Sequence, residues 1–141
     1  AGAYQAKASV KIREALAESG FNMGVAFQIV DDCLDYNGNS ELFGKSVLAD
    51  LKDGYYTLPL LYALKLDKTG ELKDITSKDD ISIDDFKKIK KIVNDVGGVK
   101  MSKEKAGEYT TKAIRVLDLL ENCIYKEILI NIIDGLIFRN H

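Results

Sequence analysis

Three aspartates within five residues are the groups in this sequence whose type and spacing best fit a chemical role. They are Asp31, Asp32 and Asp35, in the segment FQIVDDCLD of residues 27–35. Each residue of an α-helix turns about 100°, so Asp31 and Asp35 fall about 40° apart on one face. Gln28 and Asp32 lie within the same arc. Carboxylates on a rigid helix suit Mg²⁺, which keeps several waters and shares its coordination with substrate phosphates. The spacing therefore predicts a carboxylate face that holds Mg²⁺ against a diphosphate.

The residues just before the aspartates are small or apolar, and this predicts that the segment is buried. They are Gly24, Val25, Ala26, Phe27, Ile29 and Val30. Buried carboxylates normally ionise only beside a cation or within a dense hydrogen-bond network. An alternative interpretation is an amphipathic helix whose acidic end reaches solvent near Asn37, because acidic residues spaced by four are common on solvated faces.

Composition excludes several classes of protein. The sequence has 141 residues, of which 20 are basic and 22 acidic, for a net charge of −2. This balance argues against a nucleic-acid or anionic membrane surface, and no apolar run approaches the ~20 residues of a membrane span. Cys33 and Cys123 form no CxxC pair, and the only histidine, His141, leaves no zinc ligand set and no Cys-His apparatus. We therefore expect a reduced, cytoplasmic protein.

The hydrophobic periodicity is helical throughout and predicts a single all-α domain over residues 1–141. The expected helices cover residues 3–36, 57–66, 82–96, 100–122 and 126–138, with irregular segments at 37–53 and 67–82. Gly20 is a candidate break in the first helix, and Thr57 is the expected N-cap of the second. Ser82 and Asp85 resemble a capping box, and the pair Gly97 and Gly98 is expected to end that helix. The chain starts inside a helical pattern without a methionine, which indicates a fragment of a longer protein.

A second group of candidate residues follows the aspartates. Lys45 comes after a glycine, ten residues beyond Asp35, and Asp50 follows it. A lysine there is a compact charge suited to a phosphate oxygen. Taken singly, each of these residues is equally an ordinary surface residue. Their order is more specific, because FQIVDDCLD is followed by GKSVLAD and then by DGYYTLP, over residues 27–60. This ordered set resembles the second aspartate-rich region of the trans-type isoprenyl diphosphate synthases, the polyprenyl synthetase family.

The resemblance covers the whole chain as the C-terminal half of such an enzyme. It implies part of an all-α barrel of helices around a deep cavity, and a Mg²⁺-dependent condensation of isopentenyl diphosphate with an allylic prenyl diphosphate, in a homodimer. The metal ligands it implies are Asp31, Asp32, Asp35 and Asp50, of which Asp31 is the expected direct ligand. Lys45 would neutralise the diphosphate. Phe27 and Gln28 would line the floor where the isopentenyl unit lies.

Two features separate this sequence from the family pattern. Tyr55 and Leu48 stand where the family has a lysine and tends to have a small residue. The other aspartate-rich motif of the family lies upstream and has no counterpart in residues 1–141, so the chain alone is expected to be inactive. These features leave open a second hypothesis, that the chain is a non-catalytic subunit or degenerate paralogue that partners an active synthase. A helical interaction module with a solvated acidic helix is the third.

Overall fold

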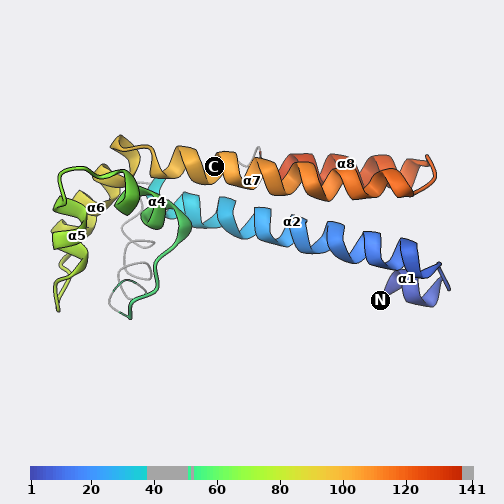
Figure 1. The fold of residues 1–141 in the computed structure, drawn as a ribbon, viewed down its shortest axis with the longest axis horizontal. Coiled ribbons are helices and arrows are strands. Elements are labelled where there is room, and N and C mark those ends of the chain that lie inside the picture. The colour runs from blue at the N-terminus through green and yellow to red at the C-terminus, as the bar shows by residue number, and fades with distance from the viewer. Residues whose placement is uncertain (38–50, 52, 138–141) are drawn as a thin grey trace. The chain divides into compact units, whose positions relative to one another are not determined.

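The computed structural model describes residues 1–37, 51 and 53–137. Within these residues every regular element is a helix, so the predicted all-α class is confirmed (Figure 1). The elements are α1 (Gly2–Gln5), α2 (Val10–Asn37), α4 (Leu58–Leu66), α5 (Glu71–Thr76), α6 (Ile83–Asp95), α7 (Gly98–Arg115), the 3-10 helix η1 (Val116–Leu119) and α8 (Ile124–Ile137). The predicted site residues Lys45 and Asp50, and Leu48, lie outside the described residues.

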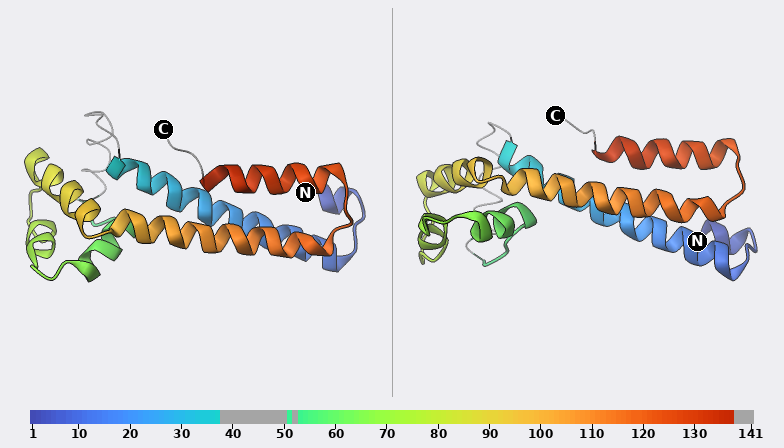
Figure 2. Two further views of the ribbon diagram at one scale, coloured as in Figure 1. Left: turned by 90° about the horizontal axis from the view of Figure 1, so that it is seen from above. Right: turned by 45° about the horizontal axis from the view of Figure 1, so that its top comes forward.

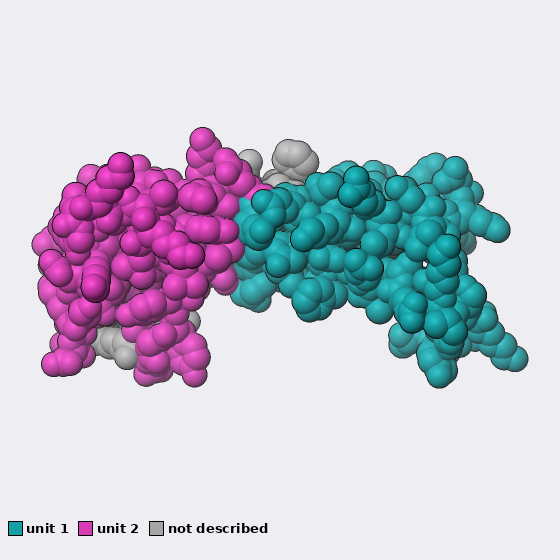
Figure 3. Space-filling view, in the orientation of Figure 1, with its two compact units in different colours: residues 1–30, 105–141 teal, residues 31–104 magenta. Residues whose placement is uncertain are grey.

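The chain divides into two compact units (Figure 3). One unit contains residues 1–30 and 105–141, and the other contains residues 31–104. The helices α2 and α7 each contribute to both units. The single domain expected over the whole length stays a prediction.

In the unit of residues 1–30 and 105–141, α8 folds back along α7 and packs against it (Figure 2). The small core of this unit consists of Ala113, Leu117 and Ile133, with Leu16, Met23, Ile114, Leu120 and Ile130 packed around it. A buried hydrogen bond ties α2 to α7, because the Ser19 hydroxyl donates to the Ala113 carbonyl at 2.9 Å. The N-terminal half of α2 is therefore held by both apolar and polar contacts.

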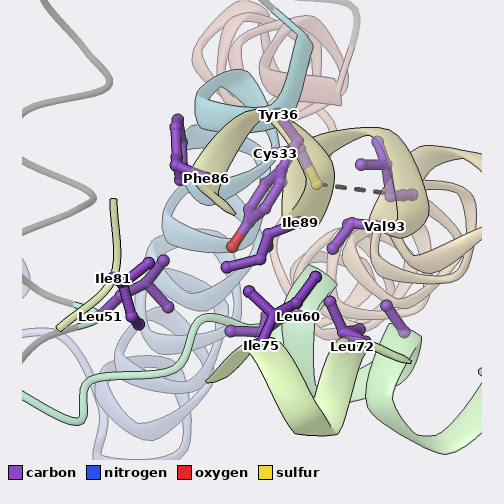
Figure 4. Packing of buried hydrophobic residues seen from close by; sticks show 12 residues of the cluster. Cys33, Tyr36, Leu51, Leu60, Leu72, Ile75, Ile81, Phe86, Ile89 and Val93 are labelled. Carbon is purple, nitrogen blue, oxygen red and sulfur yellow. Dashed lines mark hydrogen bonds between the residues drawn. The ribbon is translucent and has the colours of Figure 1, made fainter. Parts of the chain in front are cut away.

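The unit of residues 31–104 has the larger core, shown from close by in Figure 4. Its buried residues come from the end of α2, from α4, α5 and α6, and from the start of α7, together with Leu51 and Ile81. They are Cys33, Tyr36, Leu51, Leu60, Ala63, Leu72, Ile75, Ile81, Phe86, Ile89, Val93 and Val99. The last turns of α2 are thus part of the best-packed region of this unit.

The helix boundaries confirm some sequence predictions and correct others. The break expected at Gly20 is wrong, since α2 continues through it and the break lies before Val10, where Lys7 has a φ of 52°. The capping box is confirmed: the Asp85 amide donates to the Ser82 hydroxyl, and the Asp85 carboxylate accepts from the Ser82 amide.

The segment 67–82, expected to be irregular, contains the short helix α5. Asp67 makes this helix possible, because its carboxylate accepts hydrogen bonds from the backbone amides of Thr69 and Leu72, both at 2.9 Å. The Leu72 amide lies in the first turn of α5, where backbone amides have no partner within the helix. The two glycines after α6 also differ in role, because Gly97 adopts a φ of 91° while Gly98 already begins α7.

Candidate functional site

The candidate site is the outward face of α2, on which the predicted aspartates lie. Asp31 is exposed, and Asp32 and Asp35 are partly buried. Cys33, between them in the sequence, is fully buried. Because each residue turns about 100°, both Asp31 and Asp35 lie about 160° from Cys33 around the helix. The helix therefore directs the core residue inward and these two carboxylates to the opposite side.

The burial predicted for the segment before the aspartates is correct only for one side of α2. Ala26, Ile29 and Val30 are buried, whereas the Phe27 ring is 38% exposed and Gly24 is exposed. Gln28, the neighbour of Asp31 and Asp35 along the helix face, is exposed as well. These exposed residues lie on or beside the carboxylate face. They are exposed because only one side of a helix can pack against a core.

The buried side of the last turn of α2 is fixed by contacts with three other helices or their caps. Figure 4 shows Cys33 and Tyr36 pointing into the same apolar cluster, with the hydrogen bond from the Cys33 sulfur to the Val99 carbonyl, 4.0 Å long, as a dashed line. The Tyr36 hydroxyl is 3.1 Å from the Thr57 hydroxyl at the start of α4. The Asn94 side-chain amide, on α6, donates to the Tyr36 carbonyl at 3.0 Å. Sequence patterns did not identify Tyr36 or Asn94.

Electrostatics around this turn reflect both burial and nearby charge. Burial raises the pKa of the Cys33 thiol to about 11; Lys103 opposes this shift, while Asp32 and Asp35 add to it. Burial likewise raises the pKa of the Tyr36 hydroxyl to about 12, against the opposing hydrogen bond with Thr57. Both groups therefore stay protonated at neutral pH. Cys33 is therefore a buried core residue.

The donor set around the aspartates fits Mg²⁺ bound together with a diphosphate better than a closed protein cage. Among the described residues, no three Asp, Glu, His or Cys side chains converge as a complete metal site. Mg²⁺ is usually held by one or two carboxylates, with waters and substrate phosphates filling the remaining positions. An exposed Asp31, with Asp35 one turn further along α2, matches that partial coordination.

The two tyrosines that precede α4, Tyr55 and Tyr56, have different surroundings. The Tyr55 side chain is 70% exposed, whereas the Tyr56 hydroxyl donates to the Thr76 carbonyl at 3.2 Å. Thr57 occupies the predicted N-cap position of α4, but its hydroxyl bonds to Tyr36 and makes no cap hydrogen bond. Tyr55, at the position of the family lysine, thus presents a neutral hydroxyl to solvent.

Comparison with known proteins identifies the group to which this chain is related. The family model for polyprenyl synthetase matches residues 1–93. The chain belongs to the polyprenyl synthetase family. A geranylgeranyl diphosphate synthase from Methanosarcina mazei is 31% identical over 140 residues, which are 99% of this chain and 42% of the relative. A decaprenyl-diphosphate synthase from Dictyostelium discoideum is 36% identical over 115 residues, or 82% of this chain and 25% of that protein.

Solved structures of this family share the arrangement of the helices. A polyprenyl synthase from Caulobacter crescentus, complexed with calcium and isoprenyl diphosphate, superposes with a TM-score of 0.86 at 29% identity, covering 99% of this chain and 44% of that one. A geranylgeranyl pyrophosphate synthase from Corynebacterium glutamicum, with the same ligands, gives a TM-score of 0.85 at 31% identity, covering 98% and 43%. The chain therefore spans less than half the length of these polyprenyl synthetases. Among its described residues, no helix is both long and apolar enough to cross a bilayer.

Proposed function

We propose that this chain supplies one carboxylate face of a Mg²⁺-dependent prenyltransferase, which joins isopentenyl diphosphate to an allylic prenyl diphosphate. The observation that supports it is the outward placement of Asp31 on α2, in a chain of the polyprenyl synthetase family. Two structural relatives bind calcium and isoprenyl diphosphate. A divalent cation paired with a diphosphate is the ligand chemistry that the spacing of the aspartates favours.

The proposed roles follow from the position of each carboxylate. Asp31 is the direct ligand, and Asp32 and Asp35 ligate or orient the waters of the metal. Asp50 and Lys45, which lie outside the described residues, are proposed from the sequence to complete the metal shell and to neutralise the diphosphate. When bound, Mg²⁺ would neutralise the negative charge that develops on the departing diphosphate.

The residues one turn before Asp31 are proposed to contact the incoming isopentenyl unit. Phe27 offers a partly exposed ring, and Gln28 an exposed amide next to the carboxylates. An allylic cation survives only where water is excluded, so an apolar surface beneath the charged end is required. The remaining length of a polyprenyl synthetase would cover this face. We further propose a homodimer that acts in the cytoplasm.

The first test supplies that missing length. Residues 1–141 replace the homologous segment of the Methanosarcina mazei synthase, of which they cover 42%. The chimera is assayed for Mg²⁺-dependent diphosphate release and for a longer prenyl product. In the chimera, Asp31→Asn is expected to lower kcat/KM by more than about a hundredfold, because loss of even a hydrogen-bond partner of a metal ligand costs roughly tenfold to hundredfold.

A matched control separates a specific loss from a general effect of charge. Asp84→Asn removes an exposed carboxylate on α6, whose partner is Lys87 at 3.1 Å. It should leave turnover unchanged. Equal activity of the Asp31→Asn variant and the unmutated chimera would refute the assignment of Asp31. If the chimera does not fold, stabilisation of the 141-residue chain by Mg²⁺ with inorganic diphosphate tests the same binding.

A second candidate function is a non-catalytic subunit that partners an active synthase. The exposed Tyr55 favours it, because a neutral side chain replaces the charge of the family lysine where phosphate would be bound. This hypothesis predicts a folded chimera that forms no product with any allylic primer. Turnover by the same chimera would exclude the need for a lysine at this position.

A further inference from the structure

Tyr36 is buried and lies on the same helical turn as Asp35, about 100° around α2 from Asp35 and about 40° from Asp32. Its side chain is only 1% exposed, and its hydroxyl meets the hydroxyl of Thr57 at 3.1 Å. The two residues are 21 positions apart in the sequence, so this bond joins the end of α2 to the start of α4. It is therefore a tertiary contact made on the turn that bears Asp35, one turn after Asp32.

The backbone of the same turn has a second support. The last four carbonyl groups of a helix have no partner within the helix, and such ends fray unless side chains bind them. Tyr36 is the penultimate residue of α2, and its carbonyl accepts a hydrogen bond from the Asn94 side chain at 3.0 Å. Asn94 is itself oriented by a bond from its amide to the Lys90 carbonyl at 2.9 Å. The end of α2 is thus capped by α6.

The start of α4, to which Tyr36 is bonded, is also fixed. Gly98 of α7 approaches so closely that a Cβ placed there would lie 2.4 Å from the Pro59 carbonyl oxygen. Pro59 and Leu60, just after Thr57, are fully buried. The Thr57 hydroxyl therefore belongs to a rigid anchor, and the bond to it restrains the Tyr36 side chain.

We infer that Tyr36 is a positioning residue, which acts through Thr57 and Asn94 to hold the last turn of α2 and thereby orient Asp32 and Asp35 for a metal-bound diphosphate. This inference rests on the proposed function. Ligands held in advance in the binding geometry lose less conformational freedom when the metal binds. The hydroxyl of Tyr36 contacts no reacting atom in this role; it restricts the movement of the helix end that bears the carboxylates.

The test measures binding of Mg²⁺ with inorganic diphosphate to the 141-residue chain by calorimetry, together with unfolding in urea. Tyr36→Phe removes only the hydroxyl, and Thr57→Val removes its partner with little change in shape. Each variant is expected to bind about threefold to tenfold more weakly, the effect of one hydrogen bond. The double variant should bind no more weakly than either single variant, because both changes remove the same bond.

Tyr56→Phe is the matched control. It removes a neighbouring tyrosine hydroxyl, which donates to the Thr76 carbonyl at 3.2 Å. It should lower stability, though less than Tyr36→Phe because Tyr56 is 37% exposed, and should leave the affinity for Mg²⁺ and diphosphate unchanged. This comparison separates a positioning role from a merely structural one.

The outcomes distinguish the inference from the function on which it rests. If the wild-type chain binds Mg²⁺ with diphosphate and both Tyr36→Phe and Thr57→Val bind equally well, Tyr36 has no positioning role, although the proposed site stands. If the wild-type chain itself does not bind, the proposed site fails and the inference fails with it. If Tyr36→Phe does not fold, the affinity of Thr57→Val tests the inference, because this variant removes the other partner of the same hydrogen bond.

Discussion

Among the described glycines, Gly98 is the one at which the structure most clearly excludes a side chain. A Cβ added there would lie 2.4 Å from the Pro59 carbonyl oxygen, 3.0 Å from the Ala63 Cβ and 3.1 Å from the Val93 carbonyl oxygen. Two of these atoms belong to the backbone and cannot rotate away. Overpacking of this kind costs about 1–3 kcal/mol, and we expect Gly98→Ala to lower the free energy of unfolding by that amount.

The same substitution elsewhere in α7 should have the opposite sign. A Cβ at Gly107 meets no atom within 4 Å. Because glycine in a helix interior is about 0.5–1 kcal/mol less favourable than alanine, Gly107→Ala should stabilise the chain by that amount. The difference between the two variants is then about 1.5–4 kcal/mol from these two effects.

Urea unfolding followed by circular dichroism measures both free energies, with the slopes compared to confirm that the same surface is exposed. If the two units unfold in separate transitions, Gly98→Ala should shift the transition of residues 31–104. A Gly98→Ala variant that is as stable as Gly107→Ala would refute the close packing of α7 on α4. It would also remove one support of the anchor at Thr57.

Two further predictions concern titratable groups in the unit of residues 31–104. Hydrogen bonds from Lys78 and then Ser82 lower the pKa of Asp85 from 3.8 to about 2. The ionised Asp85 carboxylate therefore stabilises the fold fully above pH 4, and this contribution is lost as the pH falls towards 2. The urea midpoint should drop more steeply between pH 4 and pH 2 for the wild type than for Asp85→Asn. Separately, a thiol reagent should modify only the exposed Cys123 in the native chain and both cysteines in urea, because Cys33 is buried with a raised pKa. Rapid native modification of Cys33 would contradict its packing.

Local chemistry explains why some elements could be predicted from the sequence. The capping box of Ser82 and Asp85 involves residues three apart, and its hydrogen bonds form wherever that helix starts. The helix α5 was missed although Asp67 caps it, because its six residues carry little periodic signal. Gly20 was a poor indicator of a break, since a single glycine costs a helix only about 1 kcal/mol. Propensity alone does not end a long, packed helix.

At the candidate site, the sequence predicted the helical register of the residues but not their burial or their tertiary contacts. Helical spacing correctly placed Asp31 and Asp35 on one face, because register depends only on the helix itself. Burial was mispredicted for Phe27, since it depends on which side of α2 meets the core. The bond between Tyr36 and Thr57 was not predicted at all. It depends on where two distant segments meet, and neither residue signals the other in the sequence.

The opposite orientations of neighbouring residues on α2 carry the strongest argument for a function at this helix. Cys33 and Tyr36 are buried and held by α4, α6 and α7, while Asp31, two residues before Cys33, is exposed. A helix that needed only a solvated face could tolerate fraying at its end. This helix is instead fixed over its last two turns by three tertiary contacts. Carboxylates that together bind a metal and its diphosphate need rigid support, because small displacements of these carboxylates weaken binding.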